Sequence, residues 1–218
     1  MNARIVFDLD GTLIHSAPDI HLGVANMLAE QGLAQLDQAT VVSFIGNGLP
    51  HLAGLVMAAT GIPENRHEEI TASLMRHYDA INGQLTRPFT GVPEALDALR
   101  GAGHRLAVCT NKPEAPARDI LRMMALDCFD AVIGGNTLPQ RKPDPAPLHA
   151  ALAALGDGPA LYVGDSEVDA ETAERAGVPF LLFTEGYRKT PADSLPHLAV
   201  FSDFAALPGL IEARLAEI

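Results

Sequence analysis

Several features are scarce in this chain of 218 residues, and each scarcity excludes a class of protein. Two cysteines, Cys109 and Cys128, are too few for the disulfide framework of a small secreted domain. No run of about 18 apolar residues is present, as a membrane-spanning helix requires, and no apolar leader follows Met1. Lysine and arginine number 15 against 27 acidic residues, a formal charge of −12 that argues against nucleic acid or an anionic membrane as partner. We therefore expect a cytoplasmic protein.

The segment IVFDLDGTL at residues 5–13 is the most informative part of the sequence. Its apolar start predicts a buried strand, and Asp8 and Asp10 lie on the same side of the chain if it stays extended. Two carboxylates at the mouth of a buried strand repel each other and lose solvation, a cost that a bound cation relieves. One alternative is a polar Asp-Gly turn. Another is a calcium loop, but that needs glycine sixth and glutamate twelfth, whereas Gly11 is fourth and Asp19 twelfth here.

Further polar groups stand near the ends of other predicted strands. Thr110 and Asn111 end the strand around 105–110, Lys142 lies in the proline-rich loop 139–147, and Asp165 and Asp169 follow the strand around 160–164. Ligands of open α/β sheets bind at the carboxyl ends of the strands, so these groups are expected to converge. Each also has an ordinary interpretation, as a helix cap for Thr110 or Asp165 and as a solvated side chain for Lys142 or Asp169.

Strand and helix patterns alternate along most of the chain, which predicts a doubly wound parallel sheet. The strands are expected at about 4–9, 105–110, 131–134, 160–164, 179–183 and 198–201, and the helices at 92–102, 114–125, 145–155, 167–176 and 204–216.

The connection between the first two strands is far longer than the roughly 30 residues of a complete βαβ unit. It is typical of four helices, at 18–31, 37–44, 48–60 and 65–82. We therefore expect a small all-helical domain of residues 15–86, inserted after the first strand of a core domain of residues 1–14 and 87–218.

Four motifs together make the chain resemble the haloacid dehalogenase superfamily of phosphatases: Asp8-Leu9-Asp10-Gly11-Thr12, Thr110, Lys142, and Gly164-Asp165 with Asp169. They span residues 5–169. Within the superfamily, the segments DLDGTLIHSAP (8–18), FIGNGL (44–49), TNKP (110–113) and KPDPAP (142–147) are similar to those of phosphoglycolate phosphatases. His15 departs from the acidic residue that is common at its position.

The resemblance implies a Rossmann-like core with a helical cap over the active site. It implies Mg²⁺-dependent hydrolysis of a small phosphate monoester, 2-phosphoglycolate above all, through an aspartyl-phosphate intermediate. In this assignment Asp8 is the nucleophile, and Asp10 is the general acid and base. The metal ligands are the Asp8 carboxylate, the Asp10 backbone carbonyl and the Asp165 carboxylate.

The resemblance gives the other motif residues supporting roles. Thr110 and the backbone N–H of Asn111 would hold phosphate oxygens. Lys142 would balance the charge on the phosphate and the nucleophile, and Asp169 would orient Lys142 or a metal-bound water.

The segment Gly46-Asn47-Gly48 lies between two expected helices of the insert. It is not a dinucleotide-binding fingerprint, because no strand precedes it and the third glycine is missing. It is either a flexible turn or, as the resemblance implies, a loop that selects the substrate. Residues 46–60 contain no lysine or arginine to pair with a substrate carboxylate. The candidates there are the backbone N–H groups after Gly48 and the imidazole of His51, which is otherwise a surface or packing histidine.

Other functions remain open at this stage. A dehalogenase lacks the second motif aspartate, whereas Asp10 is present. A phosphomutase or a phosphatase for a phosphosugar, a nucleotide or pyrophosphate has the same motifs, and a catalytically silent binding module would not need them intact. The expected partner is a small phosphorylated metabolite, and the expected state is a monomer or a homodimer.

Overall fold

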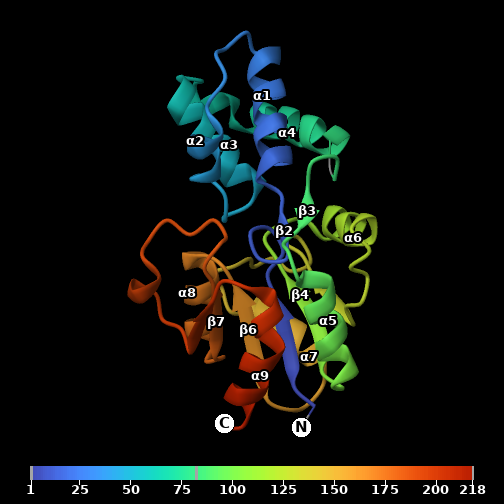
Figure 1. Cartoon of the computed structure of the whole chain (residues 1–218). Helices are drawn as coiled ribbons and strands as arrows, with labels where there is room; N and C mark the ends of the chain where they lie inside the picture. Colours follow the sequence, from blue (N-terminus) through green and yellow to red (C-terminus); the bar gives the residue numbers. More distant parts are fainter. Residues whose placement is uncertain (1, 82, 218) are drawn as a thin grey trace.

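The computed structural model describes residues 2–81 and 83–217, and a six-stranded parallel sheet forms its centre (Figure 1). Most strand residues are buried, as a parallel sheet covered on both faces requires. The doubly wound parallel sheet predicted from the sequence is therefore confirmed. In spatial order the strands are β5 (Ala131–Ile133), β4 (Arg105–Cys109), β1 (Arg4–Phe7), β6 (Ala160–Gly164), β7 (Phe180–Phe183) and β8 (Ala199–Phe201).

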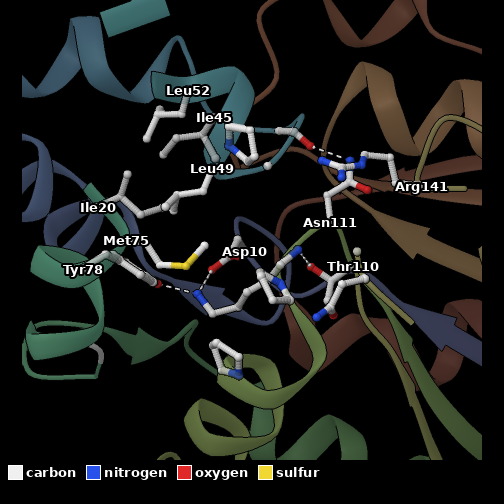
Figure 2. Close-up of a pocket in the computed structure, with 18 of the residues that line it drawn as sticks. Asp10, Ile20, Ile45, Leu49, Leu52, Met75, Tyr78, Thr110, Asn111 and Arg141 are labelled. Carbon is white, nitrogen blue, oxygen red and sulfur yellow. Dashed lines mark hydrogen bonds and ion pairs between the residues drawn. The ribbon is translucent and has the colours of Figure 1, made fainter. Parts of the chain in front are cut away.

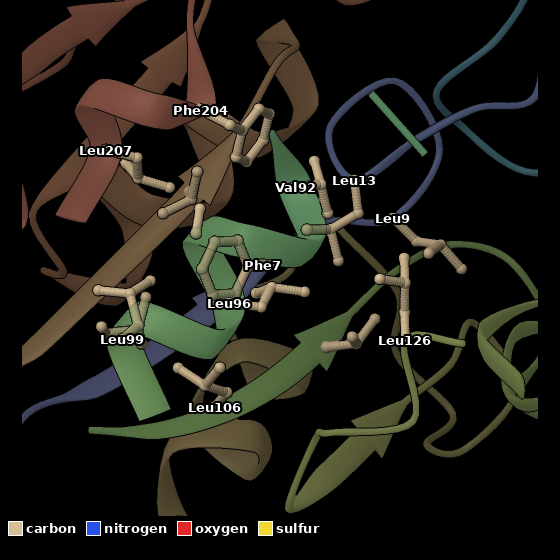
Figure 3. Packing of buried hydrophobic residues seen from close by; sticks show 14 of the residues in the cluster. Phe7, Leu9, Leu13, Val92, Leu96, Leu99, Leu106, Leu126, Phe204 and Leu207 are labelled. Atoms are coloured by element: carbon tan, nitrogen blue, oxygen red, sulfur yellow. The ribbon is translucent and has the colours of Figure 1, made fainter. Parts of the chain in front are cut away.

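Helices cover both faces of the sheet. Val6 and Phe7 are neighbours on β1 and belong to different hydrophobic clusters, because successive side chains of a strand point to opposite faces. Figure 3 shows the cluster around Phe7, which includes Leu96, Leu106 and Leu207. Its helices are α5 (Val92–Gly101), α6 (Glu114–Met123) and α9 (Leu207–Leu215), and those of the other cluster are α7 (Ala146–Ala154) and α8 (Glu167–Ala176).

The chain runs from β1 to β4 on one side and later returns to β6 on the other side of β1. The strand β1 thus stands at the switch point of the sheet, where ligands of such folds bind. Most bounds agree with the predicted ones to within two residues, but the helix expected at 204–216 begins with a 3₁₀ turn, η3 (Phe204–Ala206). A second 3₁₀ turn, η2 (Ala192–Ser194), precedes β8.

Four helices between β1 and β4 lie together above the carboxyl edge of the sheet (Figure 1). They share a hydrophobic cluster of their own, in which Val24 and Leu28 lie with Ile70 and Leu74. Residue 82, the last of the helix expected at 65–82, is outside the described residues. The bounds are α1 (Ala17–Glu30), α2 (Gln38–Val42), α3 (Leu49–Thr60) and α4 (His67–Ile81), with a 3₁₀ turn η1 (Glu64–Arg66) before α4.

The chain passes between the sheet and this insert twice, and the two crossing segments pair with each other as short strands. The short strands β2 (Ile14–His15) and β3 (Arg87–Pro88) are antiparallel, and the sequence pattern did not predict them. Because β2 spans the first proposed boundary and β3 begins directly at the second, the division into residues 15–86 and the remainder stays a prediction. Within the described ranges, every helix is too short or too polar to cross a bilayer.

A buried carboxylate ties the second crossing to the first. Asp19, in the first turn of α1, accepts hydrogen bonds from the backbone N–H groups of Gly83 (2.9 Å), Leu85 (2.8 Å) and Thr86 (3.2 Å). The Thr86 hydroxyl donates a fourth bond at 2.5 Å. The chain therefore enters and leaves the insert through one hydrogen-bonded unit.

Candidate active site

The polar residues singled out in the sequence converge at the carboxyl edge of the sheet. Asp8 follows β1, Thr110 follows β4 and Asp165 follows β6, and all three are buried. Lys142, from the loop before α7, and Asp169, from the first turn of α8, are buried beside them. The solvated positions considered for Lys142 and Asp169 are therefore wrong, because the two side chains form a buried ion pair.

Lys142 links the two parts of this cluster. Its ammonium lies 2.8 Å from Asp8 Oδ1 and 2.7 Å from Asp169 Oδ1, and it donates to the hydroxyl of Tyr162 at 3.0 Å. Burial alone would lower the pKa of Lys142, but the two carboxylates raise it above its usual range. The amine is therefore held as a cation. Tyr162, on β6, also donates to Asp169 at 2.7 Å, and its place in an apolar strand gave no signal of this role.

Asp169 has little free acceptor capacity. Besides Lys142 and Tyr162 on Oδ1, its Oδ2 accepts from the backbone N–H (3.1 Å) and hydroxyl (2.7 Å) of Ser166 and from the N–H of Asp165 (3.2 Å). Although burial opposes it, the ion pair and these hydrogen bonds hold the pKa of Asp169 below its usual value. Ser166 and Asp169 also form the capping box that begins α8, so Asp165 is not the cap.

The acidic cluster fits a metal ion. Carboxylate oxygens of Asp8, Asp165 and Asp169 lie within 4.8 Å of one another. Burial, and then the neighbouring Asp169, raise the pKa of Asp8 to about 7 and that of Asp165 well above its usual value. Three buried carboxylates face one buried ammonium, and Asp8 Oδ1 has no hydrogen bond of good geometry within the described ranges. A hard divalent cation with oxygen ligands would relieve this excess of negative charge.

The position of Asp165 explains two residues of the first motif. A Cβ at Gly11 would lie 2.5 Å from Asp165 Oδ2, and one at Gly186 would lie 2.3 Å from the same atom. Both glycines therefore permit the close approach of backbone to the carboxylate. The Thr12 hydroxyl donates to Oδ1 at 2.8 Å, and the N–H of Tyr187 donates to Oδ2 at 2.6 Å. Tyr187 was not found from the sequence, because it lies in an irregular segment after β7.

Asp10 has a different cationic neighbour from Asp8. Asp10 Oδ1 lies 3.6 Å from Nζ of Lys112, a buried side chain that also donates to the hydroxyl of Tyr78 on α4 (Figure 2). In the sequence, Lys112 follows the predicted strand around 105–110 and belongs to the TNKP segment, but no role was predicted for it. Tyr78 was not predicted either, because it fits the apolar stripe of a helix.

A cavity of about 400 Å³ opens between the sheet and the insert (Figure 2). Asp8, Asp10, Thr110 and Asn111 line it from the sheet side. On the insert side the lining is mainly apolar and includes Ile20, Ile45, Leu49, Leu52 and Met75.

The predicted substrate loop reaches this cavity in part. Gly46 and Gly48 line it, whereas Asn47 and His51 are not among its lining residues. Because His51 is also exposed to solvent, the geometry gives no support to its role as a ligand for the substrate.

Asn111 connects the loop to the sheet side. Its Nδ2 donates to Gly46 O at 3.0 Å and to Lys142 O at 3.1 Å, so Asn111 joins the loop at 46–48 to the loop that carries Lys142. Thr110 Oγ1 accepts from the N–H of Lys112 at 3.2 Å, and so its own proton is free for another acceptor. Thr110 does not cap α6, because the N-cap residue of that helix is Pro113.

His15, which departs from the family pattern, contacts the aromatic residues Tyr187 and Phe89. Its Nδ1 lies 3.1 Å from the Tyr187 hydroxyl, and its ring packs 5.7 Å from that of Phe89. The imidazole is exposed and is not among the lining residues of the cavity.

Comparison with known proteins identifies the family to which the chain belongs. Residues 5–183 match the family described as haloacid dehalogenase-like hydrolases. The chain belongs to that family. It is similar to a phosphoglycolate phosphatase of Cereibacter sphaeroides, with 54% identity over 97% of this chain and 99% of the relative. A phosphoglycolate phosphatase of Aquifex aeolicus is 38% identical over 85% of this chain and 86% of its own length.

Solved structures agree with this membership. The crystal structure of a predicted phosphoglycolate phosphatase from Haemophilus somnus superposes with a TM-score of 0.88, at 32% identity, and covers 95% of this chain and 96% of that one. A putative β-phosphoglucomutase from Thermotoga maritima has a TM-score of 0.77 at 21% identity, with 98% and 99% of the two chains covered. At that identity the second likeness shows the shared fold alone.

Proposed function

We propose that this chain is a Mg²⁺-dependent phosphatase that hydrolyses 2-phosphoglycolate to glycolate and phosphate. The observation that supports it most is the buried Asp8, paired with Lys142 and close to Asp165, at the floor of a cavity that Asp10 also lines. The substrate follows from the relatives named phosphoglycolate phosphatase, which match nearly the whole chain. The phosphomutase alternative is not favoured, because the putative β-phosphoglucomutase shares only its fold with this chain, at 21% identity.

In the proposed reaction an Asp8 oxygen attacks phosphorus, and the bond from phosphorus to the ester oxygen breaks. Asp10 gives its proton to the departing oxygen, which leaves as the hydroxyl of glycolate. Asp10 then takes a proton from a water whose oxygen attacks phosphorus. The bond between Asp8 and phosphorus breaks, which releases phosphate and restores both carboxylates to their first state.

The surrounding residues would hold the phosphoryl group during both steps. Lys142, kept as a cation by Asp169, would offset charge on the phosphoryl oxygens and on Asp8. Thr110 and Asn111 both line the cavity, and the hydroxyl of the first and the backbone N–H of the second are the proposed donors to the phosphoryl oxygens. Asp8, the Asp10 carbonyl and Asp165 are the proposed ligands of Mg²⁺, which when bound would supply positive charge against the anionic substrate.

The insert is proposed to act as a cap that closes over the site and excludes water. Its contribution to the cavity wall, with Ile45 and Leu52 among the apolar lining, supports this role.

A phosphate-ester panel tests the proposal. Purified protein should release phosphate from 2-phosphoglycolate faster than from phosphosugars, nucleotides or pyrophosphate, and EDTA should abolish the activity. Asp8→Asn should be inactive while its circular dichroism is unchanged, and Asp193→Asn, at an exposed position, should retain full activity. If Asp8→Asn retains more than a few per cent of the wild-type kcat, the covalent mechanism is wrong.

A further inference from the structure

We infer that Lys112 is the residue that recognises the carboxylate of the substrate. This inference rests on the proposed phosphatase function and extends it to a class of substrate. That class consists of phosphate esters in which one carbon bears both the carboxylate and the ester oxygen.

The ammonium of Lys112 is buried at the cavity and incompletely used. Its side chain is 5% exposed, and the structure gives Nζ one hydrogen bond, to the Tyr78 hydroxyl. A lysine has three N–H donors, so two of them are free for another acceptor. The Tyr78 ring lies 4.5 Å from Nζ, which adds a cation–π contact and fixes the ammonium in place.

Asp10 is the complementary half of this arrangement. Its Oδ1 lies 3.6 Å from Lys112 Nζ, beyond hydrogen-bond distance, and has no hydrogen-bond partner among the described residues. The two side chains therefore lie next to each other, and both residues line the cavity.

The spacing matches the chemistry of an α-hydroxy acid ester. In the proposed reaction Asp10 protonates the ester oxygen, and in 2-phosphoglycolate only one methylene separates that oxygen from the carboxyl carbon. A substrate whose ester oxygen contacts Asp10 thus carries its carboxylate to the neighbouring position, where Lys112 lies. Charge-assisted hydrogen bonds of this kind are short and strong.

Among the described lining residues, Lys112 is the one buried cation. The insert side is mainly apolar, and an ionised carboxylate there would lose its solvation without compensation. Lys112 and Arg141 are the two cations among the described lining residues. Arg141 is exposed and lies near Gly48, so water already solvates it, whereas the Lys112 ammonium is buried and lies 3.6 Å from Asp10 Oδ1.

The test compares 2-phosphoglycolate with 2-hydroxyethyl phosphate, in which a hydroxymethyl group replaces the carboxylate. Wild-type protein should have the higher kcat/KM with 2-phosphoglycolate. In Lys112→Met the ratio of the two kcat/KM values should fall by about tenfold to a hundredfold, the range expected for a lost hydrogen bond between charged groups. The loss should appear mainly in KM, because the carboxylate is bound equally in the ground state and the transition state.

Two further variants separate the possible outcomes. Arg141→Gln is the matched control and should leave the ratio unchanged within about threefold. Tyr78→Phe keeps the ring and removes the hydroxyl that orients the ammonium, so it should lower the ratio by a few-fold; it also serves if Lys112→Met does not fold. The compound 3-phosphoglycerate, with its carboxylate one carbon further away, should respond less to the Lys112 substitution.

Several results would overturn the inference. An unchanged ratio in Lys112→Met, with equal losses on both substrates, would mean that Lys112 serves Asp10 or the fold. A tenfold fall of the ratio in Arg141→Gln would assign the carboxylate to Arg141. In either case the preference of the wild type for 2-phosphoglycolate would stand, and the proposed function with it. If the wild type shows no preference between the two substrates, both the inference and the proposed substrate are wrong.

Discussion

Replacement of the proposed nucleophile by its uncharged isostere should stabilise the metal-free protein. Burial and the neighbouring Asp169 raise the pKa of Asp8 from 3.8 to about 7. Between these values the folded chain keeps a proton at Asp8 that the unfolded chain has released, so the free energy of unfolding falls as the pH rises through this interval. Since one pKa unit corresponds to about 1.36 kcal/mol, an ionised Asp8 costs about 4 kcal/mol above pH 7.

The variant Asp8→Asn removes this charge and keeps the shape of the side chain. In EDTA at about pH 8 we expect its free energy of unfolding to exceed that of the wild type by about 2–4 kcal/mol. Near pH 4.5, where Asp8 itself is protonated in the folded chain, the gain should shrink to about 1 kcal/mol or less. Urea denaturation at the two pH values measures both quantities.

Two comparisons make this prediction specific to the acidic cluster. The exposed control Asp193→Asn should follow the wild type at both pH values. Saturating Mg²⁺ should stabilise the wild type by about 2.7 kcal/mol at a hundredfold excess over Kd, and should stabilise Asp8→Asn less because a ligand is lost. If Asp8→Asn is less stable than the wild type in EDTA at pH 8, the ion pair with Lys142 outweighs burial, and the reasoning fails.

Two further predictions concern the metal and the chain crossings. Mg²⁺ should raise the Tm of the wild type by about 5–10 °C at a hundredfold excess over Kd, and that of Asp165→Asn by much less; equal shifts in a thermal melt would remove Asp165 from the metal site. Asp19→Ala leaves three backbone N–H groups and the Thr86 hydroxyl without their acceptor, so urea denaturation should show a loss of about 3–5 kcal/mol, and a loss below about 1 kcal/mol would contradict the assigned role.

The main features of the fold and of the acidic cluster could be predicted because both follow from local patterns. Short apolar runs ending in Asp8, Thr110 and Asp165 predict buried parallel strands, and the carboxyl ends of such strands meet at one edge. The topology of a parallel sheet alone therefore predicts that these residues lie near one another. Lys142 was found through its motif alone, since nothing in its own loop distinguishes a buried lysine from a solvated one.

The residues that sequence reasoning missed act through contacts between distant parts of the chain. Lys112 meets Tyr78 across 34 positions, and Asp19 meets Thr86 across 67. Helical and strand periodicity report which side of an element is apolar, not which side chain stands opposite. On that criterion Tyr78 is simply part of the buried face of α4, and Asp19 is an acidic residue in a first helical turn.

Tyr187 couples the position of the insert to the hydrogen bonding of Asp165 in the acidic cluster. Its backbone N–H holds Asp165 Oδ2, while its hydroxyl accepts from the N–H of Ala17, at the start of α1, and lies beside His15. The ring belongs to the hydrophobic cluster of the insert, although the residue comes from the segment after β7. Any displacement of α1 from the sheet must therefore break the bond to Ala17 or move Tyr187, and movement of Tyr187 changes the hydrogen bonding of Asp165.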